Sequence, residues 1–296
     1  MSLPRRTLPK SRALPRFRLL STLAATVAAT LAATLGVAAP AAAADPFPSS
    51  MASTGDSITR GFNACGFYVD CPSRSFSTGT DTGVNAHYRR ILAANPAING
   101  RNFNNAETGA AAADLPGQID LAVSQNVDYV TVLIGANDAC TSSEATMTPV
   151  ATYRGHINTA LARLKAGRPG ARVFIMSIPD VKRLWEVGKG DFLARSAWSL
   201  FGICQSLLAN PTSTAAADVA RRDRVRQRVA DYNGQLAAAC AAYGSLCKYD
   251  GGAVFNYPFA LSQVSGWDYF HPNTAGQTVL ASTSWAAGFA WTPALV

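Results

Sequence analysis

The sequence predicts an α/β protein in which a parallel β-sheet lies between two layers of helices. Short apolar stretches alternate along the chain with segments of helical periodicity, and this alternation is typical of right-handed βαβ crossovers. The clearest strand is residues 127–135 (VDYVTVLIG), a β-branched apolar run that ends at a glycine. With 296 residues, 48% of them hydrophobic, the chain has enough apolar side chains for a packed core, so a disordered protein is excluded.

The individual elements can be placed in order along the chain. Strands are predicted from short apolar stretches at residues 50–54, 101–106, 127–135, 172–178 and 245–249. Helices are predicted from apolar residues at helical spacing at residues 84–94, 115–125, 153–166, 216–242 and 273–289. Gly167 and Pro169 end the third of these helices. No internal repeat or low-complexity linker follows residue 50, so we expect one domain over residues 45–296.

Residues 1–44 have the order of a secretory signal peptide. Basic residues without any acid come first and are followed by an uncharged run over residues 19–44, which ends in three alanines before Asp45. The run is long enough to cross a membrane as an uncleaved anchor. It consists mostly of Ala and Thr, however, and Pro40 interrupts it, which favours cleavage. We therefore expect a secreted, extracellular protein, and the Arg5-Arg6 pair leaves general or twin-arginine export open.

The net charge of +8 comes mainly from that first segment. Its cations are Arg5, Arg6, Lys10, Arg12, Arg16 and Arg18. The rest of the chain has 20 Lys and Arg against 18 Asp and Glu, a net charge of +2. A nucleic-acid-binding domain is expected to be strongly basic, and the chain lacks the glycine-rich nucleotide motifs. Nucleic acids and nucleotides are therefore not expected partners.

The cysteines form an even set, which predicts disulfides in an exported protein. They are Cys65, Cys71, Cys140, Cys204, Cys240 and Cys247. No Cys-x-x-Cys pair occurs and the three histidines lie in distant segments, so no metal site is expected. Proximity in the sequence favours Cys65–Cys71 and Cys240–Cys247, which leaves Cys140–Cys204 as the third pair.

Polar residues follow the predicted strands at the points where the strands end. Gly55-Asp56-Ser57 follows the first strand, Thr108-Gly109 the second and Gly135-Ala136-Asn137-Asp138 the third, while Asp268-Tyr269-Phe270-His271 precedes the last helix. Each block by itself is typical of a turn or a helix cap. Because ligands bind at the carboxyl ends of parallel strands, we expect the four blocks to meet there.

Together the four blocks contain the groups that ester hydrolysis requires. Ser57 is the expected nucleophile, and His271 is the base that takes its proton and later delivers it to the leaving alcohol. Asp268 is expected to orient the imidazole. The N–H groups of Ser57 and Gly109 and the side-chain amide of Asn137 are the expected donors to the tetrahedral oxyanion.

These motifs resemble the SGNH, or GDSL-type, hydrolase family over nearly the whole mature chain. The family's four blocks match Gly55-Asp56-Ser57, Gly109, Gly135 to Asp138, and Asp268 to His271, in that order. The resemblance implies a three-layer α/β/α sandwich with a flavodoxin-like five-stranded parallel sheet, and ester hydrolysis without a metal or another cofactor. Some relatives use a backbone carbonyl in place of the acid, whereas Asp268 here predicts a complete triad.

Other candidate residues are expected to have structural roles. Asp56 is interpreted as fixing the nucleophile turn, and Asp138 and Asp180 as residues that either orient a base or, as is commoner, cap a turn. His87 lies beside two arginines in a helical segment, so we expect it to be exposed or partly packed, and His156 has no acidic partner at helical spacing. An α/β-hydrolase elbow needs Gly-x-Ser-x-Gly, and Thr59 stands in the place of its second glycine.

Two segments bear on the substrate. Residues 181–211, which also contain Trp185, Phe192 and Trp198, have an apolar stripe at helical spacing: Leu193, Ala197, Leu200, Phe201, Cys204, Leu207 and Leu208. The stripe predicts either a helix that packs on the core or a wall of an acyl-chain groove. Five arginines between Arg221 and Arg228 predict a solvated helix face or a contact with anionic lipid head groups.

We therefore expect a monomeric hydrolase that acts on lipid acyl esters, as a lipase or phospholipase, with transient contact with a lipid interface. Residues 71–79 and 85–88 resemble phospholipase-B-like members of the family. A carbohydrate esterase that removes acetyl groups is the alternative enzyme, because the same family includes both activities. A binding module with a degenerate site is a third interpretation, against which the intact Ser57, Gly109, Asn137 and His271 argue.

Overall fold

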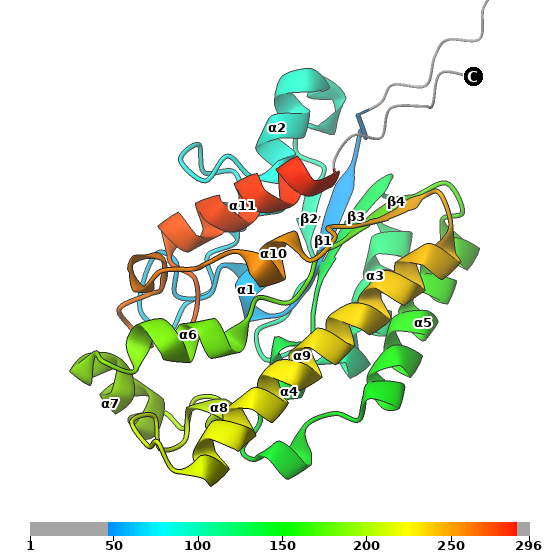
Figure 1. Ribbon diagram of the computed structural model, residues 1–296. Coiled ribbons are helices and arrows are strands. Elements are labelled where there is room, and N and C mark those ends of the chain that lie inside the picture. Colours follow the sequence, from blue (N-terminus) through cyan, green and yellow to red (C-terminus); the bar gives the residue numbers. More distant parts are fainter. Residues whose placement is uncertain (1–46, 289–296) are drawn as a thin grey trace, which may run out of the picture. The chain divides into compact units, whose positions relative to one another are not determined.

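A five-stranded parallel sheet forms the centre of the structure, a computed structural model that describes residues 47–288 (Figure 1). The strands are β1 (Met51–Gly55), β2 (Asn102–Asn104), β3 (Tyr129–Leu133), β4 (Arg172–Ile175) and β5 (Cys247–Tyr249). Their order is β2-β1-β3-β4-β5, and every neighbouring pair is parallel. Every residue of β1 and β3 is buried, as expected for strands covered on both faces. The predicted fold class is confirmed.

Helices cover both faces of this sheet (Figure 1). The helices that form the two layers are α2 (His87–Ala94), α3 (Leu115–Ser124), α5 (Val150–Gly167), α9 (Ala216–Tyr243) and α11 (Thr274–Gly288). The other helices, none longer than nine residues, are α1 (Ser57–Arg60), α4 (Ala136–Ala139), α6 (Val181–Gly188), α7 (Phe192–Leu200), α8 (Gln205–Leu208) and α10 (Ala253–Asn256). Single 3₁₀ turns lie at Pro72–Arg74, Pro96–Ile98, Ala112–Asp114, Glu144–Thr146 and Leu261–Gln263. Helices α3, α5 and α9 pack side by side in one layer, and α2 and α11 lie in the other.

The apolar stripe of residues 181–211 does not lie on one continuous helix. Asp191 caps the start of α7 by accepting a hydrogen bond from the N–H of Ala194, and Gly202, with φ of 61°, follows the end of that helix. The break divides the stripe. Ala197, Cys204, Leu207 and Leu208 are buried, whereas Leu193, Leu200 and Phe201 are exposed. Only part of the stripe therefore packs on the core.

Three disulfides are present, and they pair the cysteines as proximity in the sequence favours. They are Cys65–Cys71, Cys140–Cys204 and Cys240–Cys247. The second joins the end of α4 to the residue before α8 and closes a loop of 64 residues. Because loop-closure entropy grows with loop length, this bond constrains the unfolded chain most.

The predicted signal peptide lies outside the described residues. Within residues 47–288, no helix has the length and apolarity required to cross a membrane.

His87 is fully buried, so the prediction of an exposed or partly packed side chain is wrong. It lies on the inner face of α2 with Tyr88 and Ile91. One ring nitrogen lies 3.1 Å from the hydroxyl of Tyr129 and the other lies 2.8 Å from that of Ser284. The neighbouring arginines were misleading because adjacent residues of a helix point in different directions. Burial, with a smaller effect of the charge on nearby Arg90, lowers the pKa of His87 to about 3.

We expect His87 to make the fold sensitive to acid. Between pH 6.5 and about 3 the unfolded chain protonates this residue and the folded chain does not. The unfolded state therefore binds more protons, and the free energy of unfolding falls as the pH is lowered through this window, by at most about 1.4 kcal/mol per pH unit. Guanidinium unfolding at pH 7, 5.5 and 4 measures this loss.

His87→Gln provides the comparison, because the difference between the two proteins removes the contributions of all other titrating groups. The variant should be less stable than the wild type at pH 7, since its packing is altered, but it should lose less stability on acidification. Parallel stability curves for the two proteins would contradict the assignment.

Candidate active site

Ser57 lies at the sharp turn between β1 and α1. Gly55, the last residue of β1, has φ of 147°, and a Cβ there would overlap with the carbonyl oxygen of Leu133 on β3, so only glycine fits. Asp56 caps α1 by accepting a hydrogen bond from the N–H of Ile58 at 2.9 Å. These two residues fix Ser57 at the carboxyl edge of the sheet, where parallel α/β folds bind ligands.

Ser57, His271 and Asp268 form a continuous chain of hydrogen bonds. The Oγ of Ser57 is 2.7 Å from Nε2 of His271, and Nδ1 of His271 is 2.6 Å from Oδ2 of Asp268. With a proton on Nδ1, the imidazole donates to the carboxylate and accepts from the serine hydroxyl. Such an arrangement can withdraw the hydroxyl proton as the oxygen attacks a carbonyl carbon.

Asp268 is held in the charged form that this arrangement requires. Its side chain is buried, which raises its pKa, but hydrogen bonds and the nearby imidazole oppose that effect and lower the pKa below its ordinary value. Oδ1 accepts hydrogen bonds from the N–H groups of Phe270 and His271. Oδ2 accepts a third hydrogen bond, at 2.6 Å, from the side-chain amide of Asn63.

Asn63 is a site residue that sequence reasoning missed. It is 2% exposed and has φ of 60°, a conformation that Asn tolerates better than most residues. Its Nδ2 donates to Asp268, its Oδ1 accepts from the N–H of Tyr68 at 2.6 Å, and its carbonyl accepts from the hydroxyl of Ser265. Asn63 therefore joins the loop after α1 to the loop that carries Asp268. An asparagine 205 positions away from its partner gives no signal in a single sequence.

We expect Asn63→Gly to lower kcat by about 10- to 100-fold, the factor that corresponds to the free energy of a hydrogen bond to a charged group. Glycine accepts the positive φ and removes only the side chain. Because a hydrogen bond to the ionised form is lost, the pKa of Asp268 rises. Initial rates with p-nitrophenyl butyrate measure the loss, and an unchanged rate would show that Asn63 supports the loop alone.

Hydrogen bonds join the two loops that carry the predicted oxyanion donors Gly109 and Asn137. The amide of Asn137 donates one hydrogen bond to the carbonyl of Ala110 at 2.8 Å, which leaves its second N–H available. The carboxylate of Asp138 accepts from the N–H of Ala112 at 2.8 Å. Gly109 has φ of 89° and an exposed backbone. Asp138 therefore connects the asparagine and glycine blocks, a role wider than the predicted turn capping.

The remaining candidates from the sequence, Asp56, Asp180 and His156, make contacts that support the fold. Burial raises the pKa of Asp56 to about 7, against the hydrogen bond from Ile58 that lowers it. Asp180 caps α6 and forms an ion pair with Arg226 at 2.7 Å. His156 is half-buried on α5. None of these side chains is hydrogen-bonded to Ser57 or His271 among the described residues.

The five arginines of α9 do not form an open basic surface. Arg221, Arg224 and Arg226 form ion pairs with Asp218, Glu144 and Asp180 respectively. Arg222 is 1% exposed, donates a hydrogen bond to the carbonyl of Ser213 and lies over the ring of Trp185. Arg228 donates a hydrogen bond to the carbonyl of Thr148. This pairing argues against the head-group interpretation of the arginine run.

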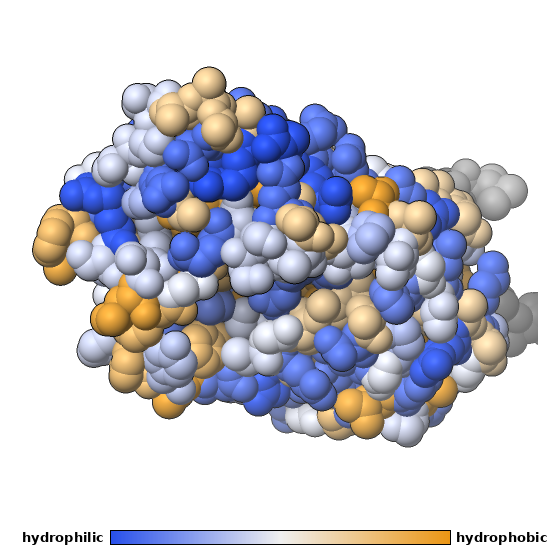
Figure 2. Space-filling model, turned by 90° about the horizontal axis from the view of Figure 1, so that it is seen from below, coloured by the Kyte–Doolittle hydropathy of each residue, from blue (hydrophilic) through white to orange (hydrophobic). Residues whose placement is uncertain are grey.

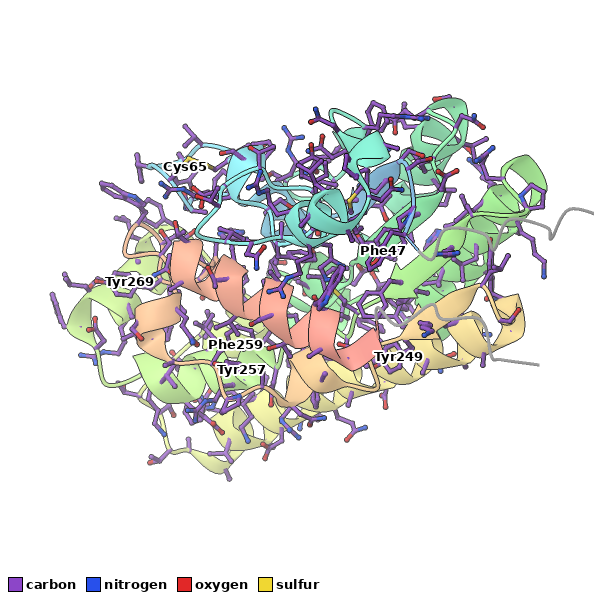
Figure 3. All side chains as sticks on the ribbon, turned by 90° about the horizontal axis from the view of Figure 1, so that it is seen from above. Phe47, Cys65, Tyr249, Tyr257, Phe259 and Tyr269 are labelled. Atoms are coloured by element: carbon purple, nitrogen blue, oxygen red, sulfur yellow. A yellow bond between two sulfur atoms is a disulfide. The ribbon has the colours of Figure 1, made fainter. Side chains whose placement is uncertain are left out.

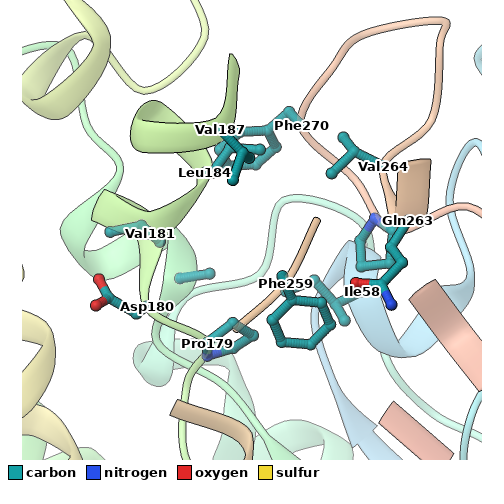
Figure 4. Close-up of a pocket in the computed structure, with 12 residues that line it drawn as sticks. Ile58, Pro179, Asp180, Val181, Leu184, Val187, Phe259, Gln263, Val264 and Phe270 are labelled. Carbon is teal, nitrogen blue, oxygen red and sulfur yellow. The ribbon is translucent and has the colours of Figure 1, made fainter. Parts of the chain in front are cut away.

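An apolar pocket with a volume of about 70 Å³ lies beside the site (Figure 4). Its walls come from α6, from the start of α1 and from the loops before α11. They are formed by Ile58, Ala136, Pro179, Asp180, Val181, Leu184, Val187, Phe259, Gln263, Val264, Phe270 and Pro272. Ile58 directly follows Ser57, and Phe270 and Pro272 flank His271, so the pocket adjoins the hydrogen-bonded chain.

A family model identifies the class of protein to which the chain belongs. The model of the GDSL-like lipase/acylhydrolase family matches residues 54–279. The chain belongs to this family and is a carboxylic-ester hydrolase. No curated protein matches the chain.

Several solved structures are similar to this chain at low sequence identity. A protein described as a GDSL-like lipase from Parabacteroides merdae is 14% identical, with 80% of this chain and 94% of that chain covered and a TM-score of 0.50. Phospholipase A1 from Streptomyces albidoflavus is 17% identical, with 81% and 99% covered and a TM-score of 0.47. A carbohydrate esterase family 2 enzyme from Corynascus thermopiles is 16% identical, with 80% and 66% covered and a TM-score of 0.45. At such identities the likeness concerns the fold and not the substrate.

Proposed function

We propose that this protein hydrolyses lipid acyl esters, with Ser57 as nucleophile, His271 as general base and acid, and Asp268 as the carboxylate that orients the imidazole. The observation that carries the proposal is the hydrogen-bonded chain of these three side chains, with Ser57 Oγ 2.7 Å and Asp268 Oδ2 2.6 Å from the imidazole, next to an apolar pocket.

In the first half of the reaction, Ser57 Oγ attacks the ester carbonyl carbon while Nε2 of His271 takes the hydroxyl proton. The negative charge that develops on the carbonyl oxygen is met by the N–H groups of Ser57 and Gly109 and by the free N–H of the Asn137 amide. The tetrahedral intermediate then breaks down. His271 gives its proton to the leaving alcohol, and the acyl group stays on Ser57.

In the second half, water takes the place of the alcohol. His271 removes a proton from the water as the water attacks the acyl carbon, and it returns that proton to Ser57 Oγ as the acid leaves. Asp268 keeps its negative charge throughout and stabilises the imidazolium that forms in each half.

The apolar pocket supports an acyl chain longer than acetyl. Its side chains include Leu184, Val187, Phe259 and Phe270, none of which can hydrogen-bond to a sugar. An acetyl group would leave most of these walls in contact with water, whereas each further methylene that enters contributes about 0.8 kcal/mol. The pocket therefore favours lipid acyl esters over acetylated carbohydrate.

The proposal includes export and maturation. Residues 1–44 would be removed as a signal peptide, and a monomer of residues 45–296 would act outside the cell. The three disulfides support this location, because such bonds persist in oxidising compartments. N-terminal sequencing of secreted protein tests the cleavage site, and a first residue before Pro40 would contradict it.

A substrate panel tests the acyl specificity. Initial rates should be compared for p-nitrophenyl acetate, butyrate and octanoate, for phosphatidylcholine and for acetylated xylan. We expect kcat/KM to rise by about tenfold or more from acetate to octanoate. Faster hydrolysis of acetylated xylan than of the lipid esters would favour the carbohydrate esterase, and no turnover with any ester would favour the binding module.

A pair of matched variants shows whether the pocket holds the acyl chain. Leu184→Trp narrows the pocket, whereas Leu121→Trp adds the same bulk at an exposed position on α3. Leu184→Trp should lower the rate on octanoate relative to acetate, and Leu121→Trp should leave that ratio unchanged. Equal ratios in both variants would place the acyl chain elsewhere.

A further inference from the structure

A disulfide-closed loop presents three consecutive apolar side chains to solvent. Phe67, Tyr68 and Val69 are 52%, 56% and 45% exposed, and the Cys65–Cys71 bond closes the loop that carries them. Single exposed apolar residues are ordinary on protein surfaces, but a contiguous exposed apolar patch marks an interaction site. The loop is therefore a candidate contact surface.

Aromatic residues from two other segments extend this surface. The ring of Phe67 lies 5.4 Å from that of Trp267, which is 54% exposed, and the ring of Tyr68 lies 6.1 Å from that of Phe201, which is 41% exposed. We call Phe67, Tyr68, Val69, Phe201 and Trp267 the rim patch. Cys65 and Tyr269, which belong to the loops of this patch, lie at the same end of the molecule (Figure 3), and apolar side chains gather at that end in Figure 2.

The rim patch is continuous with the candidate active site. The ring of Phe62 lies 5.6 Å from that of Tyr68 and 4.9 Å from that of His271. Trp267 directly precedes Asp268 in the chain. The side-chain oxygen of Asn63 accepts a hydrogen bond from the N–H of Tyr68, and the backbone N–H of Asn63 donates one to the carbonyl of Val69 at 3.0 Å. A molecule that covers the patch therefore reaches the entrance of the site.

The charged residues next to the rim patch are paired. Arg60 forms an ion pair with Asp70 at 3.0 Å, and Arg74 lies 3.7 Å from Asp81 and donates to the carbonyl of Ala64. Within the part of the chain that the structure describes, Arg60 and Arg74 are therefore not free to attract anionic lipid. Tyr and Trp have rings with an apolar body and a polar edge, which suit the boundary between lipid head groups and acyl chains.

We propose that the rim patch docks the enzyme on the surface of a neutral or zwitterionic lipid aggregate, so that an acyl ester can pass from that surface to Ser57. This proposal rests on the proposed lipid-ester activity. The occupant follows from the continuity of the patch with the site, from its paired charges and from its exposed aromatic rings. The contact is apolar and therefore insensitive to salt, unlike the head-group contact expected from the arginine run.

Vesicles of ether-linked phosphatidylcholine test the docking step, because they contain no ester that the enzyme can cleave. Binding is measured by co-sedimentation in 0.05 and 0.5 M NaCl. Phe67→Ser with Trp267→Ser should weaken binding by about tenfold or more, since each substitution removes an aromatic anchor. Phe192→Ser with Val219→Ser, which changes two other exposed apolar residues, is the matched control and should bind like the wild type.

Activity assays separate this proposal from the proposed function. The rim-patch variant should hydrolyse phosphatidylcholine vesicles about tenfold or more slowly, and dissolved p-nitrophenyl butyrate at the wild-type rate. A wild type that cleaves lipid esters but does not bind the vesicles would overturn the docking proposal alone. A wild type that binds the vesicles but cleaves no lipid ester would overturn the proposed function instead.

Two further outcomes would contradict the docking proposal. Equal losses of binding in the rim-patch variant and the control would show that the effect is not specific to this surface. A wild-type dimer in light scattering that becomes a monomer in the rim-patch variant would assign the patch to a second copy of the chain.

Discussion

Ser57→Ala is expected to lower kcat for ester hydrolysis by about 10⁶-fold, the usual effect of removing the nucleophile of a serine hydrolase. The substitution removes one oxygen atom, whose side-chain hydrogen bond is the one to Nε2 of His271. The melting temperature should therefore change little. Single-turnover rates with p-nitrophenyl octanoate and thermal unfolding of the same samples measure both quantities.

His271→Ala provides the internal comparison for this result. If the two residues act as one unit, each single variant and the double variant should lose nearly the same factor in kcat, because their effects are not additive. A fluorophosphonate should label Ser57 in the wild type and not in Ser57→Ala. Substantial turnover by either single variant would refute the roles assigned here.

Asp268→Asn is expected to lower kcat by about 10⁴-fold through the wrong histidine tautomer. The backbone N–H groups of Phe270 and His271 donate hydrogen bonds to Oδ1 of Asp268. In the variant these donors keep the amide oxygen of the asparagine at the Oδ1 position. The new amide nitrogen would then face two donors, the Asn63 amide and Nδ1 of His271. Relief of this conflict moves the imidazole proton from Nδ1 to Nε2, so that Nε2 can no longer accept the proton of Ser57.

Two controls define this second prediction. Asp120→Asn makes the same chemical change at an exposed ion pair with Arg163 and should leave kcat unchanged. The tautomer of His271 can be read from its ¹⁵N chemical shifts. Near-normal turnover in Asp268→Asn would show that another group orients the imidazole.

The fold could be predicted from the sequence because its signals are local. The β-branched run around β3 and the glycine or proline after several strands depend on neighbouring residues alone, and the observed elements lie within a few residues of the predicted ranges. The observed α2 begins at His87 and not at residue 84. Ends of elements depend on capping and packing partners that are distant in the sequence.

The candidate site was predictable in part for a topological reason. In a parallel sheet every strand delivers its last residues to the same edge, so short motifs after the strands of one sheet meet even when 200 residues separate them. Ser57 lies at this edge because it directly follows β1, and the loop before α11 brings His271 to it from 214 positions away. Asn63 could not be found by the same reasoning, because it lies in an irregular loop that no strand positions.

Two other predictions from local patterns were misleading. His87 stands next to arginines and is nevertheless buried, because the direction of a helical side chain depends on packing of the whole helix. The head-group alternative for the arginine run of α9 missed its acidic partners, such as Glu144 and Asp180, because they come from distant segments. Contacts with residues distant in the sequence therefore decide the environment of His87 and of the α9 arginines.

The bond between Cys140 and Cys204 has a practical consequence for recombinant production. It connects the segment after Asn137 to α8, where Ser206 adds a hydrogen bond to the carbonyl of Ala139 at 2.7 Å. Protein made in a reducing bacterial cytoplasm would lack the covalent connection and retain only such hydrogen bonds. Expression directed to the periplasm, where this bond can form, is therefore the appropriate source of material for every assay of the oxyanion donors.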